Sequence, residues 1–251
     1  TWAIVASLVV LAVSICSLFY ADDAKYADYN RVNYYWLKHI GNSFFVGLDG
    51  TGRLLTFLTA LCFPIILIST QKNNYKNPAA FYGLMLLTQA GLMGVFVALD
   101  ALLFYFFWEL ALIPVYFLSS KWGGEKRIQA TFKFFVYTFA GSLLMLVGIM
   151  YVYLHTPQRF FEDGVVAQHS FALQSFKAAY LNPGQQNFLF WLFFVAFAIK
   201  MPIFPFHTWQ PDTYTVAPVQ GTMLLSGIML KMGIYGLIRW LIPVVPSGIQ
   251  E

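Results

Sequence analysis

Seven long apolar stretches, separated by shorter polar segments, divide this chain. A helix that crosses about 30 Å of hydrocarbon needs roughly 20 apolar residues, and no stretch alternates apolar and polar residues as the strands of a membrane barrel do. We therefore predict an all-α, polytopic bundle of about seven transmembrane helices that forms a single transmembrane domain over residues 1–251. The predicted spans are 2–20, 51–70, 79–99, 101–120, 130–154, 187–217 and 220–242.

The sixth predicted span, residues 187–217, is unusual because it is interrupted by prolines. Proline lacks a backbone N–H and clashes with the preceding turn, so a run of prolines leaves carbonyl groups without helical partners. At membrane depth such backbone is tolerated only where it is packed inside protein or lines a watery cavity. We therefore predict a broken helix beside a hydrated space. The prolines are Pro202, Pro205, Pro211 and Pro218.

Composition supports the membrane assignment and excludes several other classes. Hydrophobic residues make up 59% and charged residues 10% of the chain, against about 25% charged in soluble domains. A net charge of +4 that lies mostly in loops argues against a nucleic-acid-binding protein. Cys16 and Cys62 both lie in apolar runs and supply neither a disulfide framework nor a metal or iron–sulfur ligand set. We assign this chain no bound cofactor.

The loops predict the orientation and the boundaries of the bundle. Two short loops at one end carry Lys72, Lys76, Lys121, Lys126 and Arg127, so this end should be cytoplasmic. The longer loops 21–50 and 155–186 mix both signs of charge and should face outward, and Asp100 should mark a tight turn at the membrane surface between the third and fourth spans. The first span has no basic segment before it, so we interpret it as a membrane helix and not a signal peptide, in a chain that is a fragment at both ends.

The few charges inside the spans carry the functional signal. Glu109 and Lys231 lie near the middle of their spans, Lys200 ends the first half of the broken span, and Lys133 is shallower. A central charge costs ~2.5–3.5 kcal/mol even on the most forgiving insertion scale, so such residues usually mark ion pathways. His207 follows within the broken span, and a histidine can accept and pass a proton near neutral pH. These five residues are our candidate proton-transfer groups.

Each of these charges also has a structural interpretation. Lys133 could extend its ammonium to the cytoplasmic interface, as Arg239 could at the outer end of its span. Glu109 could be a neutral acid hydrogen-bonded to backbone, or Lys231 could neutralise it in a static pair. The functional interpretation is different: a nearby carboxylate stabilises the charged form of a buried lysine, and withdrawing that carboxylate would release the proton.

Several motifs together resemble one family. These are "FFWELALIPVYFL", "KFFVYTFAGSLLML", "AIKMPIFPFHTWQPD", Ala217-Pro218 and "GIMLKMGIYGLIRW". They resemble the antiporter-like membrane subunits of proton-pumping NADH:quinone oxidoreductase, respiratory complex I, and subunit M in particular. The resemblance implies that Glu109 and Lys200 form the pair that controls proton transfer, that Lys231 is the central relay, and that His207 lies on the route.

The chain also departs from the pattern of this family. Members usually have Asp-Ala-His after the Trp-Leu-Pro of the broken helix, whereas this chain has Asp212-Thr213-Tyr214, so a second histidine is absent. Members have about fourteen helices, and this chain resembles the second to the eighth. The second broken helix and its terminal charged residue lie outside the resemblance, so we expect an incomplete channel that does not pump alone.

The hypothesis is therefore a proton-translocating subunit of a bacterial respiratory complex I in the cytoplasmic (inner) membrane. NADH, FMN, iron–sulfur clusters and quinone are implied on partner membrane and peripheral subunits, and no redox chemistry on this chain. One alternative is a subunit of a multi-chain sodium/proton antiporter, which would use the same lysines and glutamate. The other is a membrane scaffold whose buried charges fix helix register; charge-neutral substitutions would then impair assembly and not transport.

Overall fold

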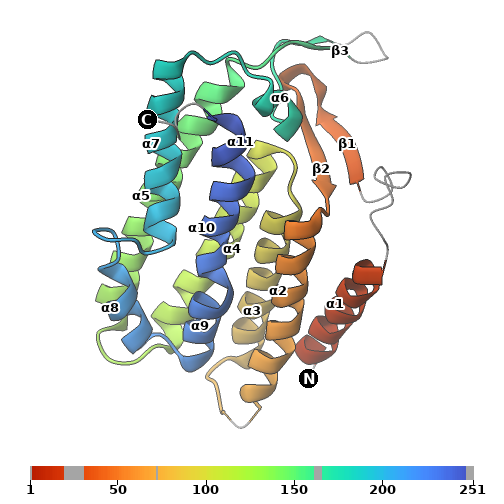
Figure 1. Ribbon diagram of the computed structural model, residues 1–251. Coiled ribbons are helices and arrows are strands. Elements are labelled where there is room, and N and C mark those ends of the chain that lie inside the picture. The colour runs from red at the N-terminus through yellow and green to blue at the C-terminus, as the bar shows by residue number, and fades with distance from the viewer. Residues whose placement is uncertain (1, 20–30, 72, 161–165, 247–251) are drawn as a thin grey trace.

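The computed structural model describes residues 2–19, 31–71, 73–160 and 166–246. Long helices run side by side to form a bundle, and short strands and one short helix cover one end of it (Figure 1). Within the described residues, six helices are long and apolar enough to cross a membrane. They are α1 (Trp2–Phe19), α2 (Gly50–Ser69), α3 (Pro78–Val97), α4 (Ala101–Trp122), α5 (Arg127–Tyr153) and a composite helix over Val219–Val244.

These six helices coincide with six of the predicted spans, and the sixth predicted span is broken. Its first half is α7 (Pro183–Lys200) and its second half is the short helix α8 (Trp209–Val216). Asn182 caps α7 with a reciprocal capping box to Gln185, which explains why the helix begins four residues before the predicted start. The membrane-spanning helical bundle is thus confirmed, with residue 20 of the first predicted span outside the described residues.

The composite helix is irregular in a way that the sequence did not indicate. It consists of α9 (Val219–Leu224), the π-helical segment η3 (Leu225–Met229), α10 (Leu230–Gly236), the π-helical segment η4 (Leu237–Leu241) and α11 (Ile242–Val244). Each π-helical segment inserts a wider turn, which changes the direction in which the following side chains point. Such segments occur often at functional sites.

Both long loops contain secondary structure where the sequence predicted only loop. The strands β1 (Arg31–Leu37) and β2 (Asn42–Gly47) form an antiparallel hairpin around the 3₁₀ turn η2 (Lys38–Ile40). The second loop contains β3 (Arg159–Phe160), β4 (Val166–Ala167) and α6 (Leu173–Lys177). The charges of these loops at residues 22, 23, 25, 28, 162 and 163 lie outside the described residues.

These two loops close over the turn between α3 and α4. The Leu99 N–H donates to the Phe45 carbonyl at 2.8 Å, the Leu173 N–H donates to the Leu99 carbonyl at 2.8 Å, and the Ala101 N–H donates to the Phe171 carbonyl at 2.8 Å. The α3–α4 turn is therefore held by backbone hydrogen bonds from both loops.

Asp100 marks this turn as predicted, and it is fully buried within the protein. Its side chain caps α4 by accepting from the N–H groups of Leu102 at 3.0 Å and Leu103 at 3.1 Å. It also accepts from the Asn42 amide at 3.0 Å and the Ser43 N–H at 3.2 Å. The sequence did not show that the β2 loop folds over this carboxylate and that protein groups replace its water.

The two basic loops lie at the same end of the bundle, opposite the strands (Figure 1). They meet directly, because the Trp122 indole N–H donates to the Lys76 carbonyl at 2.8 Å. Lys72 lies outside the described residues. The alternation of the helices therefore places both basic loops on one side, as the charge pattern predicts, and the cytoplasmic identity of that side stays a prediction.

Candidate functional site

The break between α7 and α8 positions the candidate site. α7 ends at Lys200, and Pro202 and Pro205 lie in the turn that follows, before α8 begins at Trp209. A hydrogen bond joins the two sides of this turn: the buried Trp209 indole N–H donates to the Ile199 carbonyl at 3.0 Å. In a continuous helix the Ile199 carbonyl would accept from Ile203, whose N–H instead donates to the Ala198 carbonyl at 2.9 Å. The Trp209 indole thus satisfies a carbonyl that the break leaves without a helical donor, and it joins the two halves of the span.

Only two of the four prolines in this span lie in that turn. Pro211 lies in the first turn of α8, where the missing N–H has no helical acceptor in any case. Pro218 precedes α9 and separates it from α8. Single prolines elsewhere do not end their helices, since Pro64 lies inside α2 and Pro114 inside α4. Two prolines in four residues, and not proline as such, make the break.

Lys200 is the most buried of the candidate charges, with 2% of its surface exposed. Its ammonium has no hydrogen-bond partner among the described residues. It lies 5.7 Å from the centroid of the Trp108 ring and 5.9 Å from that of the Phe134 ring. Glu109 on α4 interacts with it electrostatically. No nitrogen–oxygen contact of 4.0 Å or less joins these two described side chains, so they are neighbours without being a direct ion pair.

Glu109 lies between Lys200 and a groove on the surface of the bundle. One carboxylate oxygen, Oε1, is buried and has no partner among the described residues, and the side chain interacts with those of Ser142 and Tyr105. The groove has a volume of about 290 Å³. It is lined by Asn42, Leu102, Leu103, Tyr105, Phe106 and Glu109. The carboxylate is thus placed where a small movement of α4 would change its distance from Lys200.

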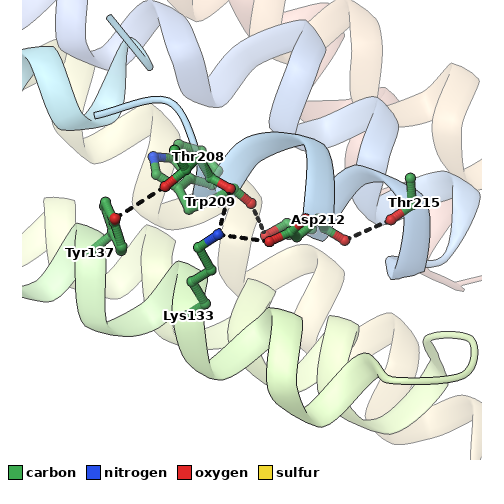
Figure 2. A network of polar contacts seen from close by, with 7 residues as sticks. Lys133, Tyr137, Thr208, Trp209, Asp212 and Thr215 are labelled. Atoms are coloured by element: carbon green, nitrogen blue, oxygen red, sulfur yellow. Dashed lines mark hydrogen bonds and ion pairs between the residues drawn. The ribbon is translucent and has the colours of Figure 1, made fainter. Parts of the chain in front are cut away.

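Lys133 on α5 binds the start of α8 (Figure 2). Its ammonium lies 2.8 Å from the Asp212 carboxylate and donates to the Thr208 carbonyl at 2.9 Å. The Thr208 hydroxyl donates to the Tyr137 hydroxyl at 3.0 Å. The Lys133 and Asp212 side chains are 36% and 52% exposed. α5 therefore holds the start of α8 through three neighbouring polar contacts.

Replacing Lys133 by methionine or Asp212 by asparagine should affect the same property, the attachment of α8. We expect each single variant to lower proton transport about two- to fivefold, and the double variant to be no worse than either single one, because exposed ion pairs contribute ~0.2–1 kcal/mol. Lys133→Arg should retain transport. Initial rates of transport in membrane vesicles give the measurement, and additive losses would show that the two side chains act independently.

His207 lies in the turn between Lys200 and α8. It is half-buried, its Nδ1 is buried without a partner among the described residues, and its ring lies 5.7 Å from that of Phe204. A ring nitrogen without a protein partner is free to bind a water molecule or a mobile side chain. The structure thus places His207 beside the break, as the sequence predicts, and its role in proton transfer stays a prediction.

Lys231 follows the π-helical segment η3 and binds its carbonyl groups. The ammonium donates to the Ser226 carbonyl at 3.3 Å and to the Gly227 carbonyl. It therefore neither neutralises Glu109 nor forms an ion pair with it among the described residues. The sequence placed Lys231 in mid-span but gave no signal for these acceptors, because π-helical geometry does not follow from apolar periodicity.

α7 and α10 approach closely between Lys200 and Lys231. A Cβ atom at Gly233 would lie 2.5 Å from the Met201 Cγ and 3.0 Å from the Phe197 carbonyl oxygen. This crossing is filled by packed atoms, so a proton that moves between the two lysines has to pass beside the crossing or after a movement of α7.

Arg239 pairs with a carboxylate and does not merely extend to the interface. Its guanidinium forms an ion pair with Asp49, which also caps α2 by accepting from the Gly52 N–H at 2.7 Å. The pair connects the composite helix to the start of α2. Sequence analysis missed it because the two residues are 190 positions apart.

Over nearly its whole length the chain is similar to known subunit M proteins. The chain is 36% identical over 246 residues to the F(420)H(2) dehydrogenase subunit M of Methanosarcina mazei, and 37% identical over 244 residues to the NADH-quinone oxidoreductase subunit M of Rickettsia typhi. Each alignment covers 96% of this chain. Because it covers 48% and 47% of the two relatives, the chain spans about half their length.

The fold also matches a chain in a solved structure of respiratory complex I from Thermus thermophilus with bound NADH. The TM-score is 0.84 at 27% identity, and the match covers 99% of this chain and 49% of that chain. Residues 98–250, which include every candidate proton-transfer residue, match the family described as NADH:quinone oxidoreductase/Mrp antiporter, TM. The chain belongs to this family of membrane subunits.

Proposed function

We propose that this chain is a proton-translocating membrane subunit of an NADH:quinone oxidoreductase in a bacterial cytoplasmic membrane. Family membership and the subunit M relatives support this function. Electrons pass from NADH to quinone on partner subunits, where NADH, FMN, iron–sulfur clusters and quinone bind. This chain converts a conformational or electrostatic signal into proton movement and carries no redox chemistry of its own.

One observation carries the proposal: the buried Lys200 ammonium has no hydrogen-bond partner among the described residues and lies at a helix break near a carboxylate. A permanently charged structural lysine needs a partner, because an unpaired buried charge is costly. Lys200 instead has Glu109 within electrostatic range but without direct contact. Such a lysine is suited to gaining and losing a proton as the distance to Glu109 changes.

In the proposed cycle, a neighbouring subunit moves Glu109 relative to Lys200. When the carboxylate approaches, the charged lysine is stabilised and holds its proton; when it withdraws, the proton leaves through water at the break and through His207. Because Lys231 donates to carbonyls as an ammonium, it first passes on its own proton, and the neutral amine then accepts the incoming one.

The test uses the intact complex in inverted membrane vesicles. Glu109→Gln and Lys231→Ala should each lower NADH-driven proton uptake about fivefold or more per NADH oxidised, while the subunits remain assembled, since central charges of this kind serve ion pathways. Uptake is followed with a pH-sensitive dye, NADH oxidation by absorbance, and assembly by native electrophoresis. Normal uptake in both variants would refute the mechanism, and loss of assembly in both would favour the scaffold interpretation.

The family description also names Mrp antiporters, which supports a sodium/proton antiporter subunit as the second candidate. The two functions differ in what drives transport. An antiporter subunit moves protons in response to an imposed sodium gradient without an electron donor. In vesicles, sodium-driven proton movement that Glu109→Gln abolishes, together with no response to NADH, would select the antiporter.

A further inference from the structure

We propose that Trp108 and Phe134 form an aromatic cradle that holds the Lys200 ammonium when Glu109 is not in contact with it. Both are positioning residues for proton transfer, and this inference rests on the proposed function. The cradle gives the lysine a second binding position. It stabilises the charged ammonium after Glu109 withdraws and before the lysine loses its proton.

The geometry of the cradle fits a cation held between two ring faces. Trp108 comes from α4 and Phe134 from α5, and the ammonium lies over both rings, 5.7 Å and 5.9 Å from their centroids. Both side chains are buried, at 1% and 0% exposure. A cation within about 6 Å of a ring centroid is attracted by the negative face of the ring, most strongly when water is excluded.

Other aromatic rings hold the cradle rigidly. The Trp108 ring lies 5.6 Å from that of Phe104 and 5.8 Å from that of Phe197, and the Phe134 ring lies 5.1 Å from that of Trp209. Trp209 is fixed in turn by its hydrogen bond to the Ile199 carbonyl, next to Lys200 itself. These contacts keep the rings in place when the Lys200 side chain alone moves, and the Trp108 ring shifts only when α4 itself is displaced.

The other charged and titratable groups on the surrounding elements do not hold the Lys200 ammonium. Glu109 on α4 is the group that interacts electrostatically with Lys200. Of the others, Lys133 on α5 is paired with Asp212, Lys231 on α10 binds carbonyls of its own helix, and Arg239 in η4 is paired with Asp49. His207 lies beyond the break. No other carboxylate among the described residues interacts with the ammonium, so the aromatic faces are its remaining support.

The cradle and Glu109 are also mechanically connected. Trp108 and Glu109 are consecutive residues of α4 and point about 100° apart around the helix axis. A rotation of α4 therefore changes both partners of Lys200 at once. A signal that withdraws the carboxylate moves one wall of the cradle as well, and Phe134 on α5 stays as the fixed wall.

Fluorinated tryptophans at position 108 test the cradle without changing its shape. Each fluorine weakens the negative face of the indole ring while the ring keeps nearly the same size. Mono-, di- and trifluorotryptophan are placed at this position in the intact complex. The alkaline limb of the pH profile of NADH-driven proton uptake should then move stepwise to lower pH, by about half a unit to one unit in total. One pH unit corresponds to 1.36 kcal/mol of weaker attraction between the ring and the charged lysine. Phe134→Leu should cause a shift in the same direction and Phe134→Tyr should not.

Trp240 provides the matched control for fluorination. It is 3% exposed and packs on Phe104 and Phe176, with ring centroids 5.2 Å and 6.0 Å away, and no described cation lies over it. The same fluorine series at Trp240 should leave the pH profile unchanged. An unchanged profile at position 108, with uptake still abolished by Glu109→Gln, refutes the cradle and leaves the proposed function intact. Normal uptake in Glu109→Gln refutes the proposed function itself.

Discussion

Lys200→Met is expected to lower NADH-driven proton uptake more than tenfold while the chain remains folded and assembled in the membrane. Methionine is similar in length to lysine and fits an apolar surrounding. Because the ammonium has no hydrogen-bond partner among the described residues, its removal leaves no donor or acceptor unsatisfied. Removing one charge of a buried ion pair is destabilising because the other charge is left uncompensated, but Lys200 forms no direct ion pair among the described residues, so the loss should fall mainly on transport.

A double variant that combines Lys200→Met with Glu109→Gln tests whether the two residues act in the same step. If both residues act in one proton-transfer step, the double variant should be no worse than Lys200→Met alone, as expected for residues that function as a unit. Proton uptake per NADH oxidised and the amount of assembled complex are the two measurements. Lys121→Met, the same substitution at an exposed position in the last turn of α4, is the control and should pump normally. Uptake above half the wild-type level in Lys200→Met would exclude Lys200 from the pathway.

The break in the sixth span was predictable from the sequence because its cause is local. Two prolines in four residues remove helical donors wherever the segment lies, and the apolar run before Lys200 fixes where α7 must end. The position of Lys200 at that end, and of His207 in the turn, followed from the same reasoning. The spans were predictable for a similar reason, since membrane thickness sets their length.

The partners of the charges were not predictable, because they depend on contacts between distant segments. Asp212 binds Lys133 from 79 positions away, and Trp108 and Phe134 meet Lys200 from two other helices. In a chain with 19% aromatic residues, no pattern singles out the two rings that face an ammonium. The sequence therefore identified which charged residues lie inside the membrane spans. Only the packing of α4, α5 and α7 showed which groups lie next to those charges.

Packing between α3 and α4 supports this site, and Gly91 on α3 is its most sensitive point. A Cβ atom at Gly91 would lie 2.6 Å from the backbone nitrogen and 2.8 Å from the Cα of Ala111 on α4. Small residues allow helix backbones in membranes to approach this closely. Because the atoms in the way are backbone, no rotamer change can make room. Gly91→Ala must therefore push α4 away from α3, two residues from Glu109.

Gly91→Ala is accordingly expected to destabilise the chain by about 1–3 kcal/mol and to reduce its amount in the membrane severalfold. Immunoblots of membranes and the temperature at which the solubilised complex loses this subunit measure the effect. Gly83→Ala is the matched control, because Gly83 lies in the same helix and an added Cβ there meets nothing within 4 Å; it should be neutral or slightly stabilising. Equal behaviour of the two variants would show that α3 and α4 do not pack this closely. If Gly91→Ala assembles at low temperature, its proton uptake should still fall, because α4 carries both Trp108 and Glu109 and its displacement moves two of the three side chains that face Lys200.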